Sequence, residues 1–69
     1  MNAGRKFRLV VENPGEEPRE SWHPDVDSAR AAADAALHED GAAELFDRIL
    51  DTAVWRREGK TGKELQPGM

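Results

Sequence analysis

Both histidines of the chain stand near carboxylates at spacings that chemistry can use. His23, Asp25 and Asp27 alternate along the sequence, and their nitrogen and oxygen atoms are of the kind that bind divalent cations. Pro24 interrupts this arrangement, and the two aspartates are better explained as capping residues at the start of a helix. We therefore expect no metal site here.

Asp34 and His38 are four residues apart, which on a helix brings an acid and a base together. On a solvent-facing helix surface, where Arg30 continues the same row, this spacing usually stabilises the helix. An exposed pair without a pocket contributes little to catalysis. We expect neither an active site nor a cofactor.

The glycines and lysine of the sequence Gly59-Lys60-Thr61-Gly62-Lys63 look faintly like a phosphate-binding loop. The segment lacks the full spacing of such a loop and the helix whose N-terminus would hold the phosphate, so we expect a turn. The chain has no cysteine, which excludes disulfides, thiolate metal sites and cysteine nucleophiles.

The net charge of −4 makes nucleic acid an unlikely partner, because an acidic surface repels phosphate. The basic residues include two local clusters, one of Arg5, Lys6 and Arg8 and the other of Arg56, Arg57, Lys60 and Lys63. The two clusters would merge into one patch if the first strand lay beside the last. Solvated strand ends explain the clusters more simply. No apolar run is long enough to span a membrane and no signal peptide is evident, so we expect a cytoplasmic location. The excess of arginine over lysine and the abundance of alanine indicate a GC-rich bacterial or phage source.

The first third of the chain has the alternation of a β-hairpin. Residues 6–12 predict a strand with one apolar face, which carries Phe7, Leu9 and Val11. Residues 13–15, Asn-Pro-Gly, are typical of a turn. Residues 19–23 predict the returning strand, with Trp22 on the face opposite Ser21.

An alanine-rich helix is predicted over residues 27–40. Asp27 is the expected N-cap, with Asp25 as an alternative, and Gly41 is placed to end the helix in the left-handed conformation. The inward stripe has little bulk, since it consists of Ala29, Ala32 or Ala33, Ala36 and Leu37. Such a helix must lie close against a flat surface, for which a small sheet is the natural choice.

Residues 43–58 fit two structures. Their apolar residues recur with a helical period, but a second helix would leave the early hairpin as an isolated ribbon, which is marginal in water. Two strands with a turn near residues 50–52 complete a sheet under the helix. We therefore predict an α+β fold, with an N-terminal hairpin and C-terminal strands packed by one helix; the alternative is a β-hairpin with a two-helix hairpin. Residues 1–65 form one domain and residues 66–69 a frayed tail.

A domain of 69 residues without disulfides is expected to be marginally stable alone. Self-association or docking on a larger protein would supply the missing burial. Large apolar groups and neighbouring arginines are typical of contact surfaces. We therefore predict a contact surface that consists of Val10, Trp22, Trp55, Arg56 and Arg57. The two tryptophans would also suit a core. We expect a non-enzymatic interaction or regulatory module, with Phe46 or Val54 extending its apolar sheet face. The alternative is an acidic mimic of nucleic acid that inhibits a DNA-binding protein.

Overall fold

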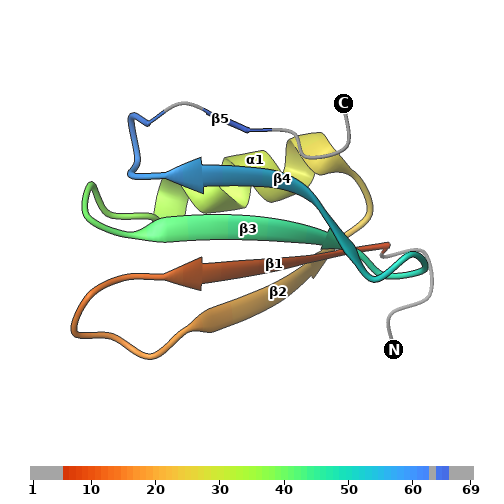
Figure 1. The fold of residues 1–69 in the computed structure, drawn as a ribbon, viewed down its shortest axis with the longest axis horizontal. Coiled ribbons are helices and arrows are strands. Elements are labelled where there is room, and N and C mark those ends of the chain that lie inside the picture. The colour runs from red at the N-terminus through yellow and green to blue at the C-terminus, as the bar shows by residue number, and fades with distance from the viewer. Residues whose placement is uncertain (1–5, 63, 66–69) are drawn as a thin grey trace.

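The computed structural model describes residues 6–62 and 64–65. Within this part of the chain, one helix packs on one face of a five-stranded antiparallel sheet with the strand order β2-β1-β3-β4-β5 (Figure 1). The elements, in chain order, are β1 (Phe7–Glu12), β2 (Arg19–His23), α1 (Val26–Ala36), β3 (Ala42–Asp47), β4 (Thr52–Glu58) and β5 (Glu64–Leu65). The α+β prediction is confirmed, and the alternative with a two-helix hairpin is wrong because residues 42–58 form strands.

The β1–β2 hairpin follows the predicted alternation of side chains. Leu9 and Val11 are buried on the face that α1 covers, whereas Val10 between them is half-buried on the opposite face. The turn after β1 is closed by a hydrogen bond of 3.1 Å from the Glu16 amide to the Asn13 carbonyl oxygen. Gly15 has a φ of 78°, the left-handed conformation that glycine adopts without steric cost.

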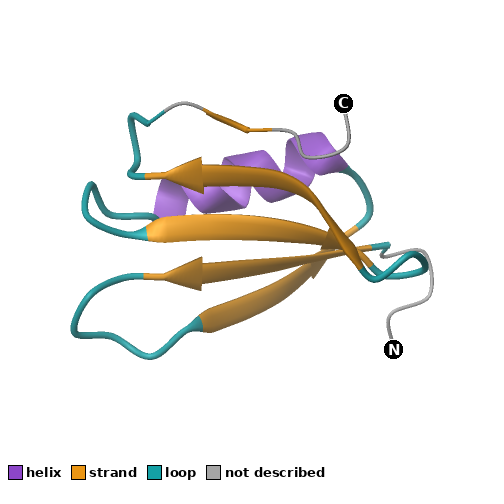
Figure 2. Ribbon diagram, viewed as in Figure 1, coloured by secondary structure: helices purple, strands orange, loops and turns teal. Residues whose placement is uncertain are grey.

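Helix α1 starts one residue earlier than predicted because Asp25, not Asp27, is its N-cap. The backbone of Asp25 is extended, and its Oδ1 accepts a hydrogen bond of 2.7 Å from the Ser28 amide. Ala29 and Ala33 of the expected stripe are fully buried. These small side chains let the helix lie close to the sheet, and Figure 2 shows that it covers one face of the sheet.

The helix ends at Ala36, so the prediction that it runs to residue 40 and ends at a left-handed Gly41 is wrong. Leu37 turns to an extended backbone (φ −80°, ψ 133°) and buries its side chain in the core. Asn13 then takes the place of a glycine cap. Its Nδ2 donates to the Ala36 carbonyl oxygen at 3.0 Å, and its Oδ1 accepts from the His38 amide at 2.8 Å.

Strands β3 and β4 form a second hairpin with one irregularity. Leu45 pairs with Trp55 and Phe46 pairs with Ala53, so Val54 is an extra residue in β4. Val54 packs against the core instead of on the outer face. The bulge fixes which side of β4 faces the helix.

The core lies between α1 and the sheet. Its apolar members are buried to within a few per cent of their surface: Leu9, Val11, Ala29, Ala33, Leu37, Ala43, Leu45 and Trp55. Trp55 is the largest fully buried side chain among them. The bulk that the alanine stripe lacks is therefore supplied from β4.

Candidate interaction surface

Trp55 and Arg57 do not belong to an exposed surface, and for these two residues the predicted surface is wrong. Trp55 is 1% exposed and packs under the helix. The Arg57 side chain is 8% exposed, forms an ion pair with Asp34 of α1 and places its guanidinium carbon 5.1 Å from the centroid of the Trp55 ring. The bulge turns both residues toward the helix, where the largest apolar group of β4 fills the space above the alanines.

The helix pair predicted between Asp34 and His38 is also wrong. Asp34 pairs across the domain with Arg57, and the His38 Nε2 lies 3.7 Å from a Glu16 carboxylate oxygen in the β1–β2 loop. The first contact ties α1 to the sheet, and the second ties the segment after α1 to the β1–β2 loop.

The other three predicted surface residues lie on the face of the sheet that α1 does not cover, which we call the open face. Val10, Trp22 and Arg56 are each half-buried there. Trp22 and Phe46 flank Arg8 on the neighbouring strands, because Arg8 pairs with Trp22 of β2 and with Phe46 of β3. We call Trp22, Arg8 and Phe46 the aromatic row.

Arg8 contacts one of the two aromatic residues of this row, Phe46. Its guanidinium carbon lies 5.0 Å from the centroid of the Phe46 ring, within the range of a cation–π contact. Arg8 was visible in the sequence only as part of a basic cluster, and the register of β1 is what gives it this place. The row presents two rings and a planar cation side by side.

A second line of residues crosses the open face next to the aromatic row. This charged row consists of Glu20, Val10, Glu44 and Arg56, in spatial order across β2, β1, β3 and β4. Arg56 lies 3.6 Å from Glu44 and 3.1 Å from Glu58, and Arg8 lies 3.8 Å from Glu20. The hydrogen bond to Glu58 raises the pKa of Arg56 above its ordinary value, and the charge of Glu44 adds to this.

The two basic clusters do not merge, because the first strand does not lie beside the strand of the second cluster. Strand β3 lies between β1 and β4, and it brings Glu44 between the arginines of the two strands. Arg5 and Lys63 fall outside the described residues. Both described arginines of the open face are matched by carboxylates of the same face.

The histidine and aspartates considered as metal ligands have separate structural roles. His23 Nε2 lies 2.7 Å from the Ser21 hydroxyl, Asp25 caps the helix, and Asp27 lies 4.0 Å from Arg30. Residues 59–62 form the expected turn, in which the Gly62 amide donates to the Gly59 carbonyl oxygen at 3.1 Å.

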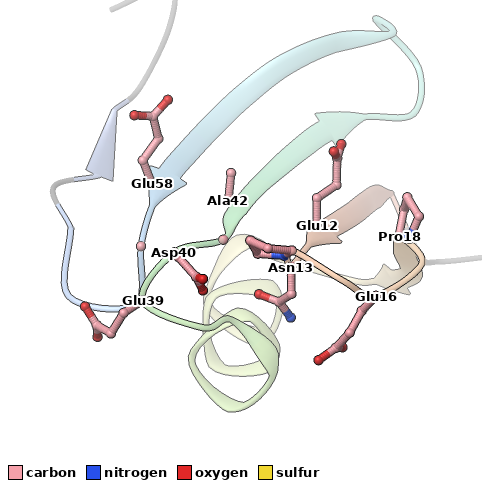
Figure 3. Close-up of a pocket in the computed structure, with 11 residues that line it drawn as sticks. Glu12, Asn13, Glu16, Pro18, Glu39, Asp40, Ala42 and Glu58 are labelled. Carbon is pink, nitrogen blue, oxygen red and sulfur yellow. The ribbon is translucent and has the colours of Figure 1, made fainter.

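An open pocket of about 570 Å³ lies at the end of the sheet where three loops meet. Its lining is acidic, with the carboxylates of Glu12, Glu16, Glu39, Asp40 and Glu58. Figure 3 shows that the side chains of Glu16, Glu39 and Glu58 point in different directions. They do not converge, and the described residues contain no group of three or more acidic or histidine side chains arranged to hold a metal ion.

No helix within the described residues is long and apolar enough to cross a membrane. Comparison of the whole chain with protein-family models, with curated proteins and with solved structures gave no match.

Proposed function

We propose that this protein is a non-enzymatic protein–protein interaction module that binds through the open face of its sheet. The observation that supports this is the aromatic row. Trp22, Arg8 and Phe46 are neighbours on three adjacent strands, half-exposed and not covered by the helix. Tryptophan and arginine are the residues most enriched among those that dominate binding energy at protein interfaces.

The charges around the aromatic row favour a protein partner over nucleic acid. Aromatic side chains on an open sheet can stack with the bases of a single strand. Here, however, Arg8 and Arg56 are each within 4 Å of a carboxylate of the same face, and the acidic pocket adjoins it at Glu12 and Glu58. These carboxylates would repel the phosphate groups of a nucleic acid, but they would not repel an uncharged protein surface.

The acidic-mimic alternative is less well supported. A mimic of nucleic acid needs carboxylates in a projecting, spaced double row. The carboxylates of this protein line a concave pocket or alternate with arginines on the open face. We therefore place the interaction module first, with a second copy or a larger protein as its partner.

The test compares two charge substitutions of large apolar residues at different places. Phe46→Glu removes one ring from the aromatic row, whereas Ile49→Glu changes a residue that is 79% exposed at the tip of the β3–β4 turn. Self-association is measured by light scattering over a hundredfold concentration range. Binding to other proteins is measured by quantitative capture from the native cell on the wild type and on both variants.

Phe46→Glu is expected to weaken binding about 30-fold or more, the effect of losing a residue worth about 2 kcal/mol. Ile49→Glu should bind as the wild type does. Circular dichroism checks that both variants fold. Equal binding by the wild type and Phe46→Glu would refute the open face as the contact surface.

A further inference from the structure

The two edges of the sheet differ in how they are protected. At one edge, β4 pairs with β5 at Arg56 and Arg57. At the other edge, β2 pairs with β1 alone, and no described element lies beyond it in Figure 1. The backbone groups of β2 that point away from β1 therefore have no strand to pair with in the described part of the chain.

Strand β2 carries two charged residues, Arg19 and Glu20, but lacks other devices that prevent pairing between edges. Such devices include bulges, lysines and prolines within the strand. The register of β2 against β1 is continuous from Arg19 to His23, without a bulge, and the strand contains neither lysine nor proline. Pro18 and Pro24 flank it directly and limit any added pairing to these five residues.

We propose that a second copy of this chain pairs with β2, antiparallel and about a two-fold axis at Ser21, to join the two sheets into one. This proposal goes beyond the function proposed above, since it uses the edge of the sheet and not its open face. A two-fold axis perpendicular to the sheet keeps the open faces of both copies on the same side. Each residue of β2 then meets a residue of the same face.

The sequence of β2 selects the register. With the axis at Ser21, all five residues are paired: Arg19 with His23, Glu20 with Trp22, and Ser21 with its equivalent. With the axis at Glu20, only three residues are paired and two carboxylates face each other, which is destabilising. With the axis at Trp22, three are paired and Glu20 faces Pro24, which has no N–H to donate.

On the open face, no two like charges stand opposite each other in the Ser21 register. Glu20 of one copy lies beside Trp22 of the second copy, whose other neighbour on the same row is Arg8. The charged row of each copy is thus continued by the aromatic row of the other. The half-exposed Trp22 gains a neighbour on its outer side, the Glu20 of the other copy.

A single cysteine tests this arrangement, because the chain has none of its own. Residues directly opposite each other in an antiparallel pair have Cα atoms about 4.5–5.5 Å apart, within the range that a disulfide spans. Ser21→Cys, oxidised with glutathione disulfide, should form a covalent dimer at least tenfold faster than Ser28→Cys. Ser28 is a matched control because it is an exposed serine in the first turn of α1.

The outcomes separate this proposal from the open-face proposal. Ser21 lies on the side of the sheet that carries the helix, so a dimer joined face to face keeps the two introduced thiols apart. A wild-type dimer in light scattering, with no faster cross-linking of Ser21→Cys than of Ser28→Cys, would overturn edge pairing. A wild type that stays monomeric up to millimolar concentration would also overturn it.

Hydrogen exchange of the unmodified protein gives a second measurement that needs no variant. The β2 amides that point away from β1 should become protected as the protein concentration rises, while the amides of the β3–β4 turn should not change. Exchange of the β2 amides that is independent of concentration, in a sample that is dimeric by light scattering, would contradict the proposal.

Discussion

Replacement of Asn13 by alanine is expected to destabilise the protein more than any other change of a polar loop residue. Asn13 is 5% exposed, although it lies in the turn after β1. Its amide joins two parts of the chain by accepting from the His38 backbone and donating to the Ala36 carbonyl oxygen. These bonds close the last turn of the helix onto the sheet.

The magnitude follows from these two hydrogen bonds. Each contributes about 1 kcal/mol net, and a buried group left without a partner costs about 1–3 kcal/mol. Because the adjoining pocket is open, water can reach part of the site, and we expect a total loss of about 2–4 kcal/mol. A chain of 69 residues has about 3–10 kcal/mol of stability in all. The melting temperature should fall by roughly 10–25 °C.

Urea unfolding followed by tryptophan fluorescence measures this loss, with Glu17→Ala in the same loop as the exposed control. Glu17→Ala should change stability by less than about 0.5 kcal/mol. A loss below about 1 kcal/mol for Asn13→Ala, with an unchanged m-value, would refute the reasoning, since it would show that water replaces the amide without cost.

Gly41 provides an internal check on the same site. A Cβ at Gly41 would lie 2.2 Å from Asn13 Oδ1 and 2.7 Å from the Glu12 carbonyl oxygen. Gly41→Ala should therefore destabilise the wild type, and by less in the Asn13→Ala background, where one of the two clashes is gone. Strictly additive losses would mean that the Asn13 side chain is not where the structure places it.

Two further changes test the buried side of β4. Trp55→Phe should cost no more than about 2 kcal/mol in urea unfolding, well below the roughly 3–5 kcal/mol expected for Trp55→Ala. The reason is that the Trp55 Nε1 is buried and has no hydrogen-bond partner among the described residues, so its removal offsets part of the lost packing. Asp34→Ala removes the partner of Arg57 and should lower stability by about 1–3 kcal/mol in thermal unfolding. Asp27→Ala is the control, since it removes an exposed and longer ion pair of the same helix, and it should cost less than about 0.5 kcal/mol. Equal losses would contradict a structural role for the Arg57 ion pair.

The first hairpin and the existence of the helix could be predicted from local pattern, whereas the end of the helix could not. Alternation and the Asn-Pro-Gly turn predict β1 and β2, and the return strand 19–23 has the predicted bounds. The end of α1 depends on Leu37, which leaves the helix to enter the core, and on Asn13, which is 25 residues away from the amide that it caps. A cap supplied by a distant loop has no signature in the sequence around the helix.

The candidate site was predicted in part for a related reason. Periodicity alone places Trp55, Arg56 and Arg57 on alternating faces, but which face receives the helix depends on the register of β4. The bulge at Val54 sets that register, and only the paired strand reveals it. Arg8 was missed as part of the aromatic row, because its neighbours Trp22 and Phe46 come from distant parts of the chain.

The different burial of the two tryptophans explains why covering the open face or the β2 edge would add stability to a domain of this size. Trp55 fills the space left by the alanine stripe and completes the core on one side of the sheet. Trp22 has no comparable partner and remains half-exposed on the outer strand. Burying a side chain of this size contributes a few kcal/mol, which is a large share of the stability of a small domain. An association that covers Trp22, on the face or at the edge, therefore stabilises the monomer fold as well as the complex, and concentration-dependent stability should accompany concentration-dependent mass.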